Sequence, residues 1–267
     1  MPDAAGARVN TVQVDRKGPV TTVILNRPAV RNAMNGIMWA ELREAFAAIE
    51  ADPGVRVAVL TGEGGTFCAG GDLRYQGAQH GTGRSERVEQ ARQLSLLLQE
   101  MDTLSKPLVA RVNGSCFAGG TGLLAVADVA IGTSEARFAI TEARLGMVPG
   151  MISQYLVRRL GIAQARRLFL TAREFNAAEA LQHGLLHRVV EAPDLDAAVE
   201  EEVQLVLRCG PAALAAIKQL LAYVDTHAPA DNSLHAIERV ADMWDSPEAR
   251  EGIAAFFEKR KPSWSTA

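Results

Sequence analysis

The chain has 267 residues, of which 48% are hydrophobic and 22% charged, a balance that allows a sizeable core. A net charge of -3 gives no reason to expect nucleic acid as a partner. The 3 cysteines form no CxxC pair, and the first residues, MPDAAGARVN, contain no apolar segment of the kind that directs secretion. No run approaches the ~18 apolar residues of a membrane span. We therefore expect a cytoplasmic protein that does not associate with membranes.

The N-terminal part of the chain predicts strands that alternate with helices. Residues 9–14 and 20–26 alternate between apolar and polar side chains, as in a hairpin. Apolar residues recur at helical spacing over 36–52, at Trp39, Leu42, Phe46 and Ile49. A buried strand over 55–61, a polar mobile loop over 77–84, a helix over 85–104 and a strand over 107–112 follow. This order indicates an α/β fold with a parallel sheet.

Helices become more frequent in the second half of the chain. We expect strands over 128–131 and 186–190, and helices over 123–127, 151–160, 163–170, 177–183, 194–207, 211–224, 233–244 and 247–258. The chain then divides into an α/β core, residues 1–195, and a helical C-terminal region, residues 196–267, that covers or extends the core.

Two glycine-rich turns follow consecutive buried strands. The first is GEGGTFCAGGD at residues 62–72, where Asp72 is placed to cap the next helix, and the second is AGGTG at residues 118–122. Turns after neighbouring parallel strands lie at one edge of a sheet. Small residues before a helix also leave backbone N–H groups free to bind an anion or a polarised oxygen. Close packing of turns and helices is the alternative explanation.

Glu142 is an isolated acidic residue with apolar and small neighbours, namely Ala139, Ile140, Ala143 and Leu145. A carboxylate in such surroundings is a candidate base with a raised pKa. The alternative is a structural acid, solvated or paired with Arg137 or Arg144. Free backbone donors together with a carboxylate base suggest chemistry that passes through an enolate.

Two further patterns suggest sites that we do not expect. Gly120-x-Gly122-x-x-Ala125 matches a dinucleotide fingerprint, but seven residues separate it from the strand, and Asp128 and Glu135 come too early to be its acidic residue. His183 and His187 have i,i+4 spacing, but Gly184 breaks the helix and no third metal ligand is evident. We therefore expect neither a nicotinamide site nor a metal site.

Six segments resemble the enoyl-CoA hydratase/isomerase (crotonase) superfamily, in its order and at its spacings, along nearly the full chain. They are LNRPAVRNAM (25–34), TFCAGGDL (66–73), VNGSCFAGG (112–120), ADVAI (127–131), TEARLGMVP (141–149) and FFEKRK (256–261). The resemblance implies an α/β crotonase (ClpP-like) spiral of ββα units whose helical C-terminal region assembles trimers or dimers of trimers. It also implies an acyl-CoA thioester substrate, with coenzyme A as part of the substrate and no separate cofactor.

The resemblance also implies roles for individual residues. The backbone N–H groups of Gly71 and Gly119 would bind the thioester oxygen as negative charge grows on it, and Glu142 would act as the acid/base.

Four further residues would contact coenzyme A: Arg31, Ala33, Ala69 and Lys259. Arg31 would meet phosphate, and basic residues near Lys259 reach coenzyme A from a neighbouring subunit in some members of the family.

One position departs from the two-acid hydratases of this family. They carry a glutamate three residues after the second oxyanion glycine, where this chain has Gly122. With Glu142 alone the attacking water loses one anchor, whereas one base suffices to move a proton between C2 and C4 of an acyl chain.

Hydration of a 2-enoyl-CoA is the leading hypothesis, with a branched or glutaconyl-type acyl group as a candidate. The segment MVPGMISQY (147–155) resembles hydratases of such thioesters, some of which also have glycine at this position, and Arg144 or Arg158 could then meet a second carboxylate. The alternatives are a Δ3,Δ2-enoyl-CoA isomerase with Glu142 as its only proton shuttle, a decarboxylase or thioester hydrolase, and a non-catalytic acyl-CoA binder.

Overall fold

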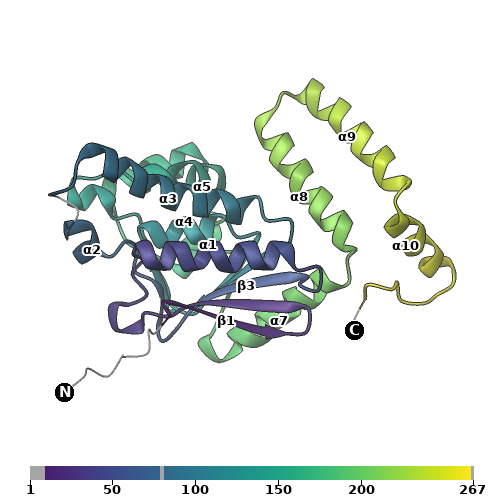
Figure 1. Cartoon of the computed structure of the whole chain (residues 1–267), viewed down its shortest axis with the longest axis horizontal. Helices are drawn as coiled ribbons and strands as arrows, with labels where there is room; N and C mark the ends of the chain where they lie inside the picture. Colours follow the sequence, from purple (N-terminus) through teal and green to yellow (C-terminus); the bar gives the residue numbers. More distant parts are fainter. Residues whose placement is uncertain (1–9, 79–80, 266–267) are drawn as a thin grey trace, which may run out of the picture.

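The computed structural model describes residues 10–78 and 81–265, so Val9 and residues 79–80 of the predicted loop lie outside the described residues. The larger sheet has the strand order β1-β2-β3-β5-β7-β10 (Figure 1). Its strands are β1 (Val12–Lys17), β2 (Val20–Leu25), β3 (Val57–Gly62), β5 (Leu108–Val112), β7 (Val129–Thr133) and β10 (Arg188–Val190). Within this sheet only the β1–β2 pair is antiparallel, which confirms the predicted hairpin and parallel sheet.

Helices cover both faces of this sheet because its central strands are apolar on both sides. Every residue of β3 is buried. Alternate residues Ala58 and Leu60 join the main core, which includes residues of α1 (Gly36–Ala51), α3 (Arg84–Asp102) and α5 (Gly150–Thr171). Val57 and Val59 join a second core under α7 (Leu195–Leu207) on the opposite face.

A smaller sheet has the strand order β4-β6-β8-β9, and the candidate site residues follow the ends of its strands. Its strands are β4 (Thr66–Cys68), β6 (Ser115–Phe117), β8 (Arg137–Ala139) and β9 (Phe175–Asn176). Strands of two or three residues are too short to show alternation, so the residue pattern did not predict them. They complete the units β3-β4-α2 and β5-β6-α4, with α2 at Leu73–Ala78 and α4 at Gly119–Ala125. The ββα architecture implied by the family resemblance is therefore confirmed.

Several boundaries differ from the predicted ones. The glycine-rich segment 118–122 is mostly the first turn of α4 rather than a turn before a helix. The predicted loop 77–84 is shorter, because Gly77 and Ala78 end α2 and Arg84 begins α3. The predicted helices over 151–160 and 163–170 are joined in α5, with a kink at Gly161 (φ 71°). The predicted helix over 177–183 is α6 (Ala177–Gln182), whose N-terminus is stabilised by a capping box between Asn176 and Glu179.

The C-terminal helices α8 (Pro211–Thr226), α9 (Pro229–Trp244) and α10 (Pro247–Phe257) form an arm that stands away from the core (Figure 1). The predicted boundary between residues 195 and 196 falls inside α7, which packs on the sheet through Leu195, Val199 and Val203. The helical region that stands apart therefore begins at α8.

The arm exposes large apolar side chains: Ile217, Leu221, Val224, Leu234, Ile237, Val240, Trp244, Ile253, Phe256 and Phe257. Among the described residues no single helix is long and apolar enough to cross a membrane. Residues 192–207 and 211–226 meet that test only as a pair bent by 100°.

Candidate active site

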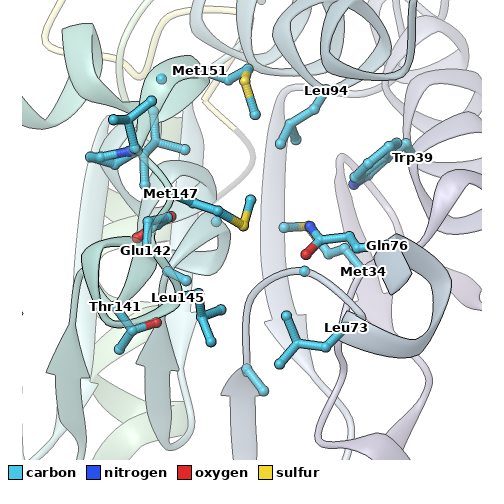
Figure 2. Close-up of a pocket in the computed structure, with 18 residues that line it drawn as sticks. Met34, Trp39, Leu73, Gln76, Leu94, Thr141, Glu142, Leu145, Met147 and Met151 are labelled. Carbon is cyan, nitrogen blue, oxygen red and sulfur yellow. The ribbon is translucent and has the colours of Figure 1, made fainter. Parts of the chain in front are cut away.

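The ends of three neighbouring parallel strands bring Gly71, Gly119 and Glu142 together. Strands β4, β6 and β8 pair in parallel, with Cys68 opposite Cys116 and Phe117 opposite Ala139. Each candidate residue follows its strand by two or three positions, so all three emerge at the same edge. They line one pocket with a volume of about 120 Å³ (Figure 2). Loops beyond the carboxyl ends of parallel strands are a usual place for ligand sites.

The backbone around Gly71 turns its N–H group toward the pocket. The carbonyl of Gly70 accepts a hydrogen bond from Met34 N–H at 2.7 Å, and Asp72 N–H donates to the Met34 carbonyl at 2.7 Å. Because the C=O and N–H of a trans peptide point in opposite directions, the N–H of Gly71 faces away from Met34. Gly70 has φ 95°, and an added Cβ would lie 2.8 Å from the Cβ of Ala118. Position 70 therefore requires glycine.

The peptide between Ala118 and Gly119 is held in the same way. The Ala118 carbonyl accepts hydrogen bonds from the N–H of Thr121 at 2.8 Å and from its hydroxyl at 2.6 Å. Ala118 N–H donates to the Ala139 carbonyl at 2.8 Å. Ala118 adopts φ 46°, a strained conformation for a residue with a Cβ, at the position that aims the N–H of Gly119.

The N–H groups of Gly71 and Gly119 lie close to each other, and the peptide orientations described above turn both toward the pocket. A Cβ added to Gly119 would lie 3.9 Å from the nitrogen of Gly71. No described residue accepts a hydrogen bond from either group. Two fixed, convergent donors can stabilise an oxygen that gains negative charge, without reorganising during the reaction.

Glu142 begins the short helix η3 (Glu142–Leu145) and faces the pocket (Figure 2). Its carboxylate oxygen Oε2 is buried and has no hydrogen-bond partner among the described residues. Burial raises the pKa of Glu142, and a hydrogen bond with its own backbone N–H lowers it less. Among the described residues neither arginine considered above forms an ion pair with Glu142: Arg137 lies 3.7 Å from Glu174, and the exposed Arg144 has no ion-pair partner.

The place beside Gly122 is already filled. A Cβ at this buried glycine would lie 2.3 Å from Cγ2 of Ile152, on α5. Ile152 lines the pocket, whereas Gly122 does not. The pocket therefore has one carboxylate, that of Glu142, among its lining residues, and an isoleucine next to the position where the family resemblance implies a second glutamate in two-acid hydratases.

Of the four residues predicted to contact coenzyme A, only Ala69 lines this pocket. Ala69 lines it, and its N–H donates to the carbonyl of Arg31 at 2.9 Å, so the exposed Arg31 lies at the same edge. Ala33 is buried, and its carbonyl accepts a hydrogen bond from Arg27. The buried amide of Asn32 holds this segment by donating to the Glu63 and Thr66 carbonyls at 2.9 and 2.7 Å.

Two other predicted residues lie away from the pocket of the same chain. Lys259 follows α10, whose arm and α2 lie on opposite sides of the molecule (Figure 1). Arg158 forms ion pairs with Asp102 and Asp225, and its guanidinium stands 5.6 Å from the ring centroid of Tyr155. A contact between Arg158 and a substrate carboxylate is therefore not supported by its position.

Trp39, Gln76 and Ile152 are among the lining residues that the sequence did not single out as functional. Trp39 followed the apolar periodicity of α1 and was assigned to the core, Gln76 lies in the polar segment after Asp72, and Ile152 was only part of a quoted motif. Asp72 itself does cap α2, accepting from the N–H groups of Arg74 and Tyr75 at 3.0 and 3.3 Å.

No group of three or more His, Cys, Asp or Glu side chains in the described ranges could hold a metal ion. The His187 ring accepts the Ala130 N–H through Nδ1 at 2.9 Å, and Nε2 lies 3.1 Å from Arg159. Helix α6 ends at Gln182, and Gly184, with φ 78°, follows its C-cap residue His183, so His183 and His187 do not share a helix.

Comparison with known proteins agrees with this fold. Residues 15–267 match the family described as enoyl-CoA hydratase/isomerase. Enoyl-CoA hydratase EchA19 of Mycobacterium tuberculosis is 34% identical, over 94% of this chain and 95% of that protein. The crystal structure of an enoyl-CoA hydratase from Shewanella pealeana has a TM-score of 0.93 at 31% identity, covering 96% of this chain and 97% of that one. Pseudomonas aeruginosa AtuE has a TM-score of 0.93 at 38% identity, covering 96% and 100%.

The chain belongs to the enoyl-CoA hydratase/isomerase family of the crotonase superfamily, and it is an enzyme of that family with the crotonase fold. Acyl-CoA thioesters are the substrates on which this family acts.

Proposed function

We propose that this enzyme adds water across the double bond of a 2-enoyl-CoA thioester, with Glu142 as its only acid/base. The observation that carries the proposal is the convergence of two unpartnered backbone N–H groups, on Gly71 and Gly119, in one pocket with a half-buried, unpaired carboxylate. The hydratase names of relatives such as EchA19 support hydration rather than another reaction of the fold.

In the proposed reaction the thioester oxygen accepts hydrogen bonds from the N–H groups of Gly71 and Gly119. The carboxylate of Glu142 takes a proton from water as the water oxygen bonds to C3, and the electrons of the double bond move toward the thioester oxygen. Glu142 then returns the proton to C2, so one molecule of water has been added and the carboxylate is restored. A donor of this kind contributes roughly 3–4 kcal/mol to transition-state stabilisation. The chemistry draws on no cofactor apart from coenzyme A in the substrate.

A single glutamate is compatible with this reaction because one carboxylate can both remove and return the proton. Its raised pKa suits this double role, because a higher pKa makes the carboxylate a stronger base toward water and brings its two protonation states closer to balance near neutral pH.

We also propose that the chain assembles as a homotrimer or a dimer of trimers through its C-terminal arm. Helices α8, α9 and α10 expose many large apolar side chains, and a concentration of such side chains on one part of a surface is typical of an interaction site. Assembly would also let a neighbouring subunit bring Lys259 to coenzyme A.

The direct test is a hydration assay in oxygen-18 water with crotonyl-CoA, 3-methylglutaconyl-CoA and a 3-enoyl-CoA, with products followed by mass spectrometry. We expect labelled 3-hydroxyacyl-CoA from at least one 2-enoyl thioester and loss of that product in Glu142→Gln. The absence of labelled product from straight, branched and glutaconyl-type thioesters would exclude the proposal.

Double-bond migration is the second candidate function, favoured by Ile152 beside Gly122. An isomerase moves a proton between C2 and C4 and requires no anchored water, so one carboxylate is enough. Deuterium exchange at both carbons of a 3-enoyl-CoA, without incorporation of oxygen-18, would show that the enzyme is an isomerase and not a hydratase. A non-catalytic acyl-CoA binder would instead be unaffected by Glu142→Gln.

A further inference from the structure

One buried donor in the pocket has no role in the reaction proposed above. Trp39, on α1, is only 6% exposed, and its indole Nε1 has no hydrogen-bond partner among the described residues. An indole nitrogen can only donate, and leaving a buried donor unpaired is destabilising. Tyr75 holds the ring in place by an edge-on contact, with ring centroids 6.1 Å apart.

The nitrogen-bearing edge of Trp39 is directed into the pocket, and Gln76 enters the pocket from the same side (Figure 2). Gln76 comes from α2, and its Nε2 would lie 2.3 Å from a Cβ added to Gly71, so the amide stands beside the oxyanion donor. Glu142 lies on the opposite side of the pocket (Figure 2). Two polar groups thus face the space that an acyl chain enters once its thioester oxygen is bound.

The indole N–H of Trp39 and the amide of Gln76 are polar groups in a pocket whose other walls are mainly apolar. Most other side chains that line the pocket are apolar: Met34, Leu73, Leu94, Met147, Met151 and Ile152. No arginine, lysine or histidine lines it, and Glu142 is its one acidic lining residue. A second carboxylate on the acyl chain would therefore be buried opposite Glu142 without a cation, which is costly.

We propose that Trp39 and Gln76 recognise a neutral oxygen, a carbonyl or a hydroxyl group, on the acyl chain beyond C3. This inference deepens the proposed function and rests on the acyl group entering this pocket. The indole N–H donates to the oxygen, and the Gln76 amide donates to a carbonyl or pairs with a hydroxyl. A hydrocarbon chain leaves the indole N–H unpaired, so the site discriminates against it.

Binding of saturated thioesters tests this inference independently of hydration, because these compounds have no double bond to hydrate. Titration calorimetry would compare hexanoyl-CoA, 5-oxohexanoyl-CoA, 4-oxohexanoyl-CoA and glutaryl-CoA on the full-length wild-type protein. We expect one of the two oxo compounds to bind about five- to tenfold more tightly than hexanoyl-CoA, the effect of one hydrogen bond.

Trp39→Phe keeps an aromatic ring and removes the N–H, and we expect it to abolish that preference. Tyr75→Phe is the matched control, because Tyr75 does not line the pocket and should leave the preference intact. Gln76→Leu provides a second variant on another helix, with the same expected loss, if Trp39→Phe does not fold.

Three results would overturn the inference: hexanoyl-CoA binding as tightly as both oxo compounds, a preference that survives Trp39→Phe, or glutaryl-CoA binding more tightly than either oxo compound. Failure of the hydratase proposal would look different, since it would show as missing oxygen-18 product while the binding preference remained measurable.

Discussion

Ile152 occupies the space into which a side chain at position 122 would project, with 2.3 Å between its Cγ2 and an ideal Cβ on Gly122. The two residues come from α5 and α4, helices that pack closely against each other. The one-carboxylate character of the site is thus a property of a packed pair and not of Gly122 alone.

Gly122→Glu should therefore destabilise the protein and add no activity. Overpacking of this kind costs about 1–3 kcal/mol, which lowers the Tm by roughly 2–10 °C in a chain of this size. Combining it with Ile152→Ala should restore part of the Tm and raise the ratio of hydration to isomerisation, because a second carboxylate can then anchor water. Thermal melts and the oxygen-18 assay measure both effects, with Ile152→Ala alone as the control. A Gly122→Glu variant as stable as the wild type would contradict the steric explanation.

Glu142→Gln should lower kcat/KM for hydration by about 10²–10⁴-fold, the usual contribution of a general acid/base. The amide has nearly the same shape, so affinity for a saturated acyl-CoA should change little. Steady-state kinetics and calorimetry separate the two effects. Equal losses of turnover and binding would point to a structural role for Glu142 instead.

The same residue should shape the pH profile of the wild type. Its carboxyl group must be ionised to take a proton from water, and burial raises its pKa above the ordinary value of 4.5. The acid limb of kcat/KM should therefore lie at a higher pH than that of an exposed glutamate. A profile with no limb above the ordinary glutamate range would argue against this assignment.

The ionisation of Glu142 that activity requires should lower the free energy of unfolding. A raised pKa means that the native state holds the proton more tightly than the unfolded chain, so this contribution is present below pH 4.5 and is lost as the pH rises through the raised pKa. Glu142→Gln cannot ionise, so its Tm should exceed that of the wild type at neutral pH, and the difference should shrink toward pH 4.5. Calorimetric scans across this range would show whether the gap closes.

Thr121→Val should weaken the oxyanion site while preserving the fold. Thr121 is fully buried and its hydroxyl donates to the Ala118 carbonyl, whereas valine has nearly the same shape and no hydroxyl. Because the backbone N–H of Thr121 still holds that carbonyl, we expect a moderate loss, roughly three- to tenfold in kcat. Thr121→Ser, which keeps the hydroxyl, should retain more activity. A valine variant with full turnover would show that the backbone bond alone positions Gly119.

How much of the site follows from local sequence differs from residue to residue. Glu142 could be selected because one acidic side chain stands out among apolar neighbours, and Gly71 and Gly119 because small residues cluster after buried strands. Trp39 could not be selected, because a tryptophan at helical spacing with Leu42 and Phe46 has the same pattern whether it packs in the core or lines a pocket.

The sequence by itself determined the order of the longer strands and helices, the crotonase motifs and the identity of the candidate base, since these depend on local periodicity, turn chemistry and residue type. Only the tertiary structure decided that β4 and β6 pair, so that the N–H groups of Gly71 and Gly119 converge from positions far apart in the chain. It also decided that Ile152 fills the place beside Gly122 and that the Trp39 nitrogen faces the pocket. These relationships depend on how helices pack across a sheet, and spacing along the chain does not specify which side chain meets which.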